Sequence, residues 1–170
     1  MAKGRLVLPP FTVIRDSREK AAYGWTWDAE KEDAYPPRCI GTEIEKLDVG
    51  DYSIRGYEDV FCIERKADIS ELWMNYADKT RFEDELIRMQ SVPHRFIIVE
   101  SVMSRDLFYL SPPQFQKGVP GKALQEWLSY LMIKYQTPIL FEGDSGRRKA
   151  MCLMKQIVRI FKDRWERKYE

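Results

Sequence analysis

The sequence contains one histidine, three cysteines and no long apolar run, and each shortage excludes a class of protein. No run is long enough to span a bilayer, and two prolines interrupt the short apolar stretch at the N-terminus, so neither a membrane anchor nor a secretory signal is predicted. We therefore expect a soluble, intracellular protein. Cys39, Cys62 and Cys152 are odd in number and widely spaced, which favours reduced packing residues over a disulfide or zinc site. His94 has no ligand partners nearby in the sequence, and we expect it at the surface.

A strong overall charge is also lacking, since the net charge is only +1, but the charge is unevenly distributed. Residues 145–170 hold nine Lys or Arg against three Asp or Glu, a balance of +6, and the rest of the chain has a balance of −5. Apolar residues recur in this segment at three- and four-residue steps, which predicts a basic amphipathic helix over 145–168. Its basic face is either the solvated side of a core helix, or a surface that contacts phosphate or forms a dimer.

Periodic patterns elsewhere predict further helices and strands. The stretches "TRFEDELIRMQ" at 80–90 and "GKALQEWLSYLMIKYQ" at 121–136 have helical spacing, and Thr80 with Glu83 forms a capping-box pattern. Runs rich in β-branched and aromatic residues predict five strands, at 11–15, 51–55, 59–65, 95–100 and 138–142. This order indicates an α/β fold with a mixed central β-sheet flanked by helices.

The domain organisation follows from length and composition. With 170 residues and 44% hydrophobic content, the chain suits one domain better than two. We expect a tail at 1–10, a core at 11–142 and then the basic helix. Two stretches, at 20–38 and 104–122, are rich in aromatic residues, proline and glycine. They are predicted to be long loops, which often carry function.

The stretch "FCIERK" at 61–66 ends an apolar strand with three charged residues. Side chains alternate between the two faces of a strand, so Glu64 and Lys66 share one face while Arg65 points to the other. Only four residues, 56–59, separate this strand from the preceding one, and a connection of that length is typical of a hairpin.

The hairpin register brings two carboxylates together. If Arg55 pairs with Val60, then Asp51 lies directly opposite Glu64. Facing carboxylates repel each other unless a positive charge lies between them. A divalent cation together with Lys66 provides such a charge, and carboxylate oxygens suit Mg²⁺ or Mn²⁺. The alternative is a salt bridge from Lys66 to either acid, with no metal.

A second charged cluster, "DSRE", follows the first predicted strand. Asp16, Arg18 and Glu19 therefore stand where a strand ends, which is a favoured position for functional sites in α/β domains. Charged residues commonly end strands, so this cluster alone also fits a solvated surface.

Four motifs in order, "VIRDSRE", "LDVGDYSI", "VFCIERK" and "RFEDELIRMQ", resemble those of the XPF/Hef-type (ERCC4 domain) structure-specific DNA nucleases. The family pattern is D-x-R-E, L-x-V-G-D-Y, V-E-R-K and a downstream helix with arginine, and the match covers 11–100. The resemblance implies a restriction-endonuclease-like nuclease core. It implies metal-dependent cleavage of branched, flapped or forked DNA during recombination, repair or replication. A non-catalytic DNA-binding partner subunit and a nuclease for unbranched nucleic acid are the alternatives.

The resemblance also implies roles for single residues. Asp51 and Glu64 are implied as metal ligands. Asp16 and Glu19 flank the metal site as further catalytic carboxylates, with Asp16 as the third candidate ligand. Lys66 polarises or orients the attacking water. The implied cofactor is Mg²⁺ or Mn²⁺, because the cation neutralises charge that develops on the phosphodiester.

Arginines are implied as phosphate ligands. Arg18 and Arg81 contact the scissile or neighbouring phosphates, and Arg65, on the opposite strand face, supports the fold or binds phosphate. One position departs from the family motif E-R-K-x-x-x-D, because Ser70 stands where that motif has aspartate. Either Asp68 or Glu71 takes over its role, or the role is absent.

No helix-hairpin-helix signature is visible in the sequence, so the grip on DNA is expected from another source. Candidates are the basic helix, with Arg147, Arg148 and Lys149 at its start, the two long loops, a homodimer or a partner protein. Aromatic residues of the loops either stack on unpaired bases or anchor the loops to the core, and they are Trp25, Trp27, Phe108 and Tyr109. A homodimer is expected to form through the apolar faces of 122–136 and 145–168.

Overall fold

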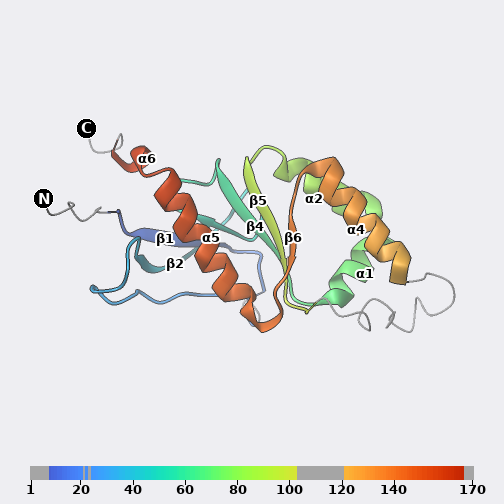
Figure 1. Ribbon diagram of the computed structural model, residues 1–170, viewed down its shortest axis with the longest axis horizontal. Coiled ribbons are helices and arrows are strands. Elements are labelled where there is room, and N and C mark those ends of the chain that lie inside the picture. Colours follow the sequence, from blue (N-terminus) through green and yellow to red (C-terminus); the bar gives the residue numbers. More distant parts are fainter. Residues whose placement is uncertain (1–7, 21, 23, 103–120, 167–170) are drawn as a thin grey trace, which may run out of the picture.

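A six-stranded sheet forms the middle layer of the protein, with strand order β2-β1-β3-β4-β5-β6 (Figure 1). The computed structural model describes residues 8–102, apart from 21 and 23, and residues 121–166. The strands are β1 (Phe11–Asp16), β2 (Cys39–Glu45), β3 (Tyr52–Ile54), β4 (Phe61–Lys66), β5 (His94–Val99) and β6 (Ile139–Phe141). Within this sheet β3 alone runs antiparallel to its neighbours. The carboxyl ends of the other five strands therefore share one edge.

Helices cover both faces of the sheet (Figure 1). On one face lie α1 (Ile69–Ala77), α2 (Lys79–Met89) and α4 (Gly121–Tyr135). On the other lies α5 (Gly146–Ile160), which follows a short 3₁₀ turn at Gly143–Ser145 and precedes α6 (Asp163–Glu166). Among the described residues, no helix is long and apolar enough to cross a membrane.

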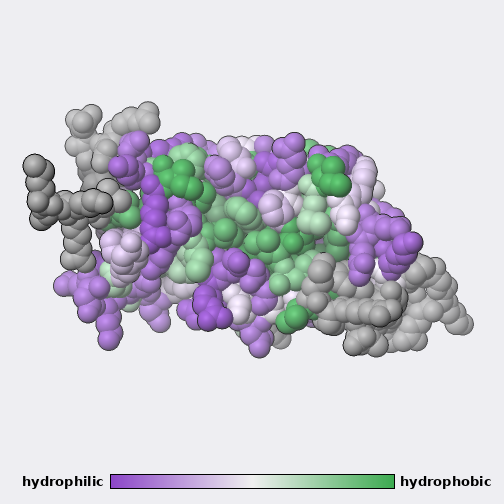
Figure 2. Space-filling model, viewed as in Figure 1, coloured by the Kyte–Doolittle hydropathy of each residue, from purple (hydrophilic) through white to green (hydrophobic). Residues whose placement is uncertain are grey.

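Two cores pack against the sheet, because alternate residues of β4 and β5 face opposite layers. Cys62 and Ile97 join the core under α1, α2 and α4, and Ile63 and Ile98 join the core under α5. Figure 2 shows apolar surface in the middle of the view, over the outer strand β6 between α5 and α4. The α/β fold with a mixed sheet is thus confirmed.

Two elements were not predicted from the sequence. Strand β2 lies at the edge of the sheet, and its residues after Cys39 are partly or fully exposed, so it has little of the apolar pattern of a buried strand. Helix α1 has only nine residues, although Ile69, Leu72 and Trp73 do follow helical spacing. The predicted loop at 104–122 lies mostly outside the described residues, and so do Phe108 and Tyr109.

The predicted helix at 145–168 is divided in the structure. Helix α5 ends at Ile160, and Phe161 leaves helical geometry with φ −105° and ψ 29°. The Phe161 ring packs 5.3 Å from the His94 ring, centroid to centroid, at the start of β5. Contact with the sheet thus ends the helix earlier than the apolar pattern predicts.

The capping box predicted at Thr80 is wrong, because α2 begins one residue earlier and Asp78 is its N-cap. The Asp78 side chain accepts a hydrogen bond from the Arg81 N–H, at 3.3 Å. Glu83 does not turn back to the helix start. It accepts hydrogen bonds from the Lys134 ammonium and the Tyr135 hydroxyl of α4, so it joins two helices.

We expect Asp78→Ala to lower the free energy of unfolding by about 1 kcal/mol, since it removes the N-cap of α2. In a domain of this size that loss lowers the melting temperature by about 2–4 °C, which differential scanning calorimetry resolves. Thr80→Ala is the matched control and is expected to be neutral, because Thr80 lies inside the helix, where alanine is favoured. A larger loss of unfolding free energy in Thr80→Ala than in Asp78→Ala would show that Thr80 is the N-cap, as the sequence predicted.

Candidate active site at the carboxyl edge of the sheet

The β3–β4 hairpin has the register predicted from the sequence. Tyr52 pairs with Ile63, and this pairing places Asp51, just before β3, beside Glu64. The Asp51 N–H donates to the Ile63 carbonyl at 2.8 Å, and Asp51 Oδ2 accepts from the Arg65 N–H at 2.7 Å. Asp51 is thus held against β4 by backbone bonds.

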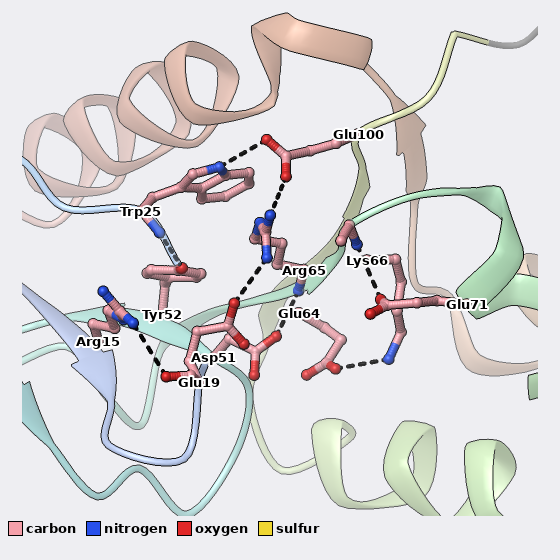
Figure 3. A network of polar contacts seen from close by, with 11 residues as sticks. Arg15, Glu19, Trp25, Asp51, Tyr52, Glu64, Arg65, Lys66, Glu71 and Glu100 are labelled. Atoms are coloured by element: carbon pink, nitrogen blue, oxygen red, sulfur yellow. Dashed lines mark hydrogen bonds and ion pairs between the residues drawn. The ribbon is translucent and has the colours of Figure 1, made fainter. Parts of the chain in front are cut away.

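Glu64 and Lys66 lie on the α2 side of the sheet (Figure 3). Lys66 Nζ is 2.8 Å from Glu64 Oε1 and 3.4 Å from Glu85 Oε2 of α2. The side chains of Glu64 and Lys66 are each 9% exposed, so this ion pair is almost fully removed from water. Two carboxylates, those of Glu64 and Glu85, therefore share one ammonium group, and the carboxylate of Asp51 lies close enough to feel its charge.

The pKa shifts reflect this imbalance of charge. Burial, with Glu19 and Glu85 nearby, raises the pKa of Asp51 to about 7, although the Arg65 N–H and Lys66 oppose the rise. Burial also raises the pKa of Glu64 well above its ordinary value. The neighbouring carboxylates outweigh the burial of Lys66 and raise its pKa. The site thus carries excess negative potential that an additional cation would relieve.

A cavity of about 510 Å³ opens onto these acids. Asp51, Glu64 and Glu85 line it together with two further acids, Asp16 and the exposed Asp48. Its four basic residues are exposed, and they are Arg18 after β1, Lys46 after β2, and Arg81 and Arg88 on α2. An acidic floor with a basic rim suits a metal ion bound together with a phosphodiester, since the rim attracts the phosphates and the floor the cation.

The donor set fits a hard divalent cation. Within residues 8–102 and 121–166, no group of three or more His, Cys, Asp or Glu side chains converges tightly enough to hold a metal ion alone. Mg²⁺ takes one or two carboxylates and completes its shell with water and substrate phosphate. Asp51 and Glu64 are the two residues that fit this requirement, and Asp51 Oδ1 has no hydrogen bond from the described residues.

Asp16, at the end of β1, is 2% exposed and uses both of its oxygens. Its Oδ1 accepts from the backbone N–H and Nε of Arg18, and its Oδ2 accepts from Arg18 Nη2 and the Leu47 N–H. Burial alone would raise the pKa of Asp16, but these bonds outweigh it and lower the pKa. Here Asp16 orients Arg18 at the cavity. Its role as a metal ligand stays a prediction.

Glu19 and Arg65 meet on the α5 side of the sheet (Figure 3). Arg65 Nη1 donates to Glu19 Oε1 at 2.9 Å, and Arg65 Nη2 donates to Glu100, just after β5. The Trp25 indole N–H donates to the other oxygen of Glu100 at 2.9 Å. The Arg65 side chain is 8% exposed, so this arrangement favours its fold-supporting alternative. Trp25 is buried as well, and so is Trp27, which favours their role as anchors.

The residues near the missing motif aspartate act locally. Asp68 is the N-cap of α1, and its Oδ1 accepts from the N–H groups of Ser70 and Glu71. Glu71 Oε2 accepts from the Ala67 N–H at 2.9 Å. Neither acid lines the described cavity, so both stabilise the turn between β4 and α1.

Sequence patterns missed Glu85 and Glu100. Glu85 lies three residues after Phe82 and one before Leu86, both buried, so its position on the inward side of α2 was a usable signal. Glu100 directly follows the parallel strand β5, and Asp16 is the last residue of the parallel strand β1. Arg18 and Arg81 line the cavity, and their role as phosphate ligands stays a prediction. The other predicted phosphate ligands, Arg147, Arg148 and Lys149, begin α5 on the other side of the sheet.

The ERCC4 domain matches residues 16–144, which include every residue of this cavity. The chain belongs to the ERCC4 domain family. This confirms the resemblance to structure-specific DNA nucleases that the four motifs indicated. No curated protein matches the sequence.

Two solved structures share the fold of this ERCC4 domain. XPF from Aeropyrum pernix is 19% identical, with a TM-score of 0.54, and the match covers 88% of this chain and 60% of that one. XPF from Aeropyrum pernix in complex with DNA is 18% identical, with a TM-score of 0.56, and the match covers 86% of this chain and 64% of that one. The chain thus spans less than two thirds of these relatives. The restriction-endonuclease-like nuclease fold is confirmed.

Proposed function

We propose that this ERCC4 domain is a Mg²⁺- or Mn²⁺-dependent endonuclease that hydrolyses phosphodiester bonds in branched, flapped or forked DNA, in recombination, repair or replication. The observation that carries the proposal is the cavity in which Asp51, Glu64 and Glu85 face a rim of arginines. Family membership and the DNA complex of the XPF relative support nucleic acid as the substrate.

The site residues divide into a cation-binding set and a phosphate-binding set. Asp51 and Glu64 would hold the metal, which when bound supplies a more acidic water and neutralises charge on the phosphate. Lys66, fixed between Glu64 and Glu85, directs its ammonium N–H groups at the attacking water or the phosphate oxygen. Its elevated pKa keeps it charged at neutral pH, so it acts as an electrostatic donor and not as a base.

The rim residues position the DNA. Arg18 is 64% exposed and is clamped by Asp16, so its remaining N–H groups are presented in a fixed direction. Arg81 and Arg88 lie on exposed positions of α2, seven residues apart, and both line the cavity. Two turns of helix separate residues seven apart, which allows them to contact successive phosphates of one strand.

The decisive measurement is cleavage of labelled flap, fork, four-way-junction and linear DNAs with Mg²⁺ or Mn²⁺. We expect the wild type to cut branched DNA at least about ten times faster than linear DNA, and Asp51→Ala and Lys66→Ala to remove all cutting. Equal rates on all substrates would favour a nuclease for unbranched nucleic acid. Binding without cutting in the wild type would favour a non-catalytic partner subunit. The homodimer through 122–136 and 145–168 stays a prediction.

A further inference from the structure

A second cavity, of about 620 Å³, lies against α5 on the opposite side of the sheet from the candidate active site. We call it the α5 groove and define it by its lining, which is Trp27, Asp144, Arg147, Arg148, Met151, Cys152 and Lys155. The loop from Thr26 to Pro36 runs along α5 and forms its other wall, because three basic side chains of α5 bind this loop in succession.

Three guanidinium groups along the groove have no acidic partner among the described residues. Arg147 donates to the Thr26 carbonyl, Arg148 to the Ser145 hydroxyl and Arg159 to the Pro36 carbonyl, each through one Nη2 atom. Lys155 differs, because it pairs with Glu30 at 2.7 Å. These neutral partners leave the three arginines without an ion pair within the described residues, although Asp144 also lines the groove, and each guanidinium has further N–H donors.

The start of α5 adds to this positive charge. Its first turn contains Arg147, Arg148 and Lys149 but no acidic residue, and the side chain of Ser145 at the N-cap accepts no hydrogen bond from the N–H groups of the first helical turn. Cations at a helix N-terminus are unfavourable, because that end already carries partial positive charge. Lys149 has Glu142 at 3.1 Å, whereas the two arginines have no such acid in the described chain. An anion bound in the groove would offset this cost.

An aromatic surface lies at the far end of the same row. The Tyr35 ring is 78% exposed, and the Arg159 guanidinium lies over it at 5.2 Å from the ring centroid. Exposed aromatic rings beside arginines provide stacking surfaces for unpaired bases, and backbone phosphates bind the guanidinium groups. Arg148 and Arg159 are eleven residues apart on one helix, about 16 Å, which is long enough for several nucleotides.

Direct contacts connect the groove to the candidate active site. A side-chain Cβ at Gly146 would lie 3.0 Å from the Trp25 ring and 3.2 Å from Glu100 Cγ, so glycine lets the helix start pack on both. Glu100 and Trp25 hold Arg65, whose neighbours in β4 are Glu64 and Lys66 (Figure 3). The start of α5 therefore packs directly on the side chains that hold Arg65.

We propose that the α5 groove binds an unpaired strand of the branched substrate, through phosphates at Arg147, Arg148 and Arg159 and base stacking on Tyr35. This inference rests on the proposed function, since it names the arm of the DNA that the α5 groove binds while the candidate active site, on the other side of the sheet, cleaves the DNA. Binding of this arm would favour branched over linear DNA, because linear duplex lacks the arm.

Cross-linking to Cys152 tests the position of this strand. Cys152 lines the groove and is exposed, whereas Cys39 and Cys62 are fully buried, so one thiol is available. The probe is flap DNA with a disulfide-activated thiol tether on the unpaired arm, on the duplex arm, or on linear duplex. The protein is Asp51→Asn, which prevents cutting.

We expect the unpaired-arm probe to cross-link at least about ten times faster than either duplex probe, and Cys152→Ser to remove the product. Equal rates for all three probes, or fastest reaction with a duplex arm, would overturn the proposal. The readout does not require cleavage. If the cross-linking shows no preference for the unpaired arm while the wild type still cuts DNA, only the proposed role of the α5 groove is refuted. If the unpaired arm cross-links preferentially but the wild type cuts no DNA, only the proposed nuclease activity is refuted.

Charge reversal at Arg148 provides an independent test. Arg148→Glu is expected to weaken flap binding about tenfold and to reduce the slope of log affinity against log salt by about 1. It should also raise the melting temperature by about 1–3 °C, since an acidic side chain interacts favourably with the N-terminus of α5. If Arg148 served to stabilise the fold, the same substitution would lower the melting temperature. Lys122→Glu, in the first turn of α4, is the matched control and should leave binding unchanged. Unchanged flap affinity in Arg148→Glu would overturn the proposal.

Discussion

Replacing Asp51 by asparagine will lower the rate of metal-dependent DNA cleavage about a thousandfold or more. A bound metal ion stabilises the transition state by several kcal/mol, and about 4 kcal/mol corresponds to a factor of about a thousand. Asparagine retains the size of the side chain and an oxygen that accepts the Arg65 N–H, so the hairpin keeps its geometry. The substitution removes the negative charge of Asp51, which together with that of Glu64 would bind a divalent cation.

The same substitution will stabilise the metal-free protein. Asp51, Glu64 and Glu85 repel one another around the single Lys66 ammonium, and a neutral amide at this position removes part of the repulsion. A gain of about 1 kcal/mol raises the melting temperature by about 2–4 °C in a domain of this size. Mg²⁺ will raise the melting temperature of the wild type, because it binds only the folded state, and will have little effect on Asp51→Asn.

Asp48 offers the matched control for Asp51. It lines the same cavity but is exposed, and no hydrogen bond or ion pair within the described chain ties it to Lys66. Asp48→Asn should retain cleavage within a few-fold of the wild type. Full activity in Asp51→Asn, or an equal loss in Asp48→Asn, would show that the cation is held elsewhere.

Replacing Lys66 by methionine will both abolish cleavage and destabilise the fold by about 3–5 kcal/mol. Removing one partner of a buried ion pair leaves the other charge without compensation, and losses of that size are typical. The Glu64 and Lys66 side chains are each 9% exposed, so water cannot replace the ammonium group. Methionine fills the space of the aliphatic stem, and it replaces the ammonium group that lies 5.1 Å from the centre of the Phe82 ring. Chemical denaturation measures the free energy of unfolding directly.

A double variant separates the two roles of Lys66. Glu64→Gln combined with Lys66→Met removes both charges of the pair, so more than half of the lost stability should return. Cleavage should remain absent, because one metal ligand and the ammonium donor are both missing. A double variant no more stable than Lys66→Met alone would mean that the two side chains are not coupled, which contradicts the 2.8 Å contact between them.

The hairpin illustrates how much of the site local sequence can predict. Alternation along β4 and a short predicted connection were sufficient to place Glu64 beside Asp51 and Arg65 on the other face. The pairing of Tyr52 with Ile63 confirms the register, although the connection between β3 and β4 spans six residues, 55–60, and not the four predicted. Adjacent strands with short connections have few possible registers. The start of α2 was harder to predict, because Asp78 and Thr80 are both suitable N-cap residues. Glu83, which a capping box at Thr80 requires, instead accepts hydrogen bonds from α4.

By itself the sequence determined the family, the α/β fold, and the catalytic carboxylates and lysine as candidates, because motif order and strand periodicity are local properties. Only the tertiary structure decided which charged residues from distant segments meet. Glu85 reaches Lys66 because α2 packs over β4, and Glu100 reaches Arg65 because β5 lies beside β4. Each of those charges would be equally stable in water. Burial of the apolar residues around them brings them together, and that depends on the packing of the whole chain.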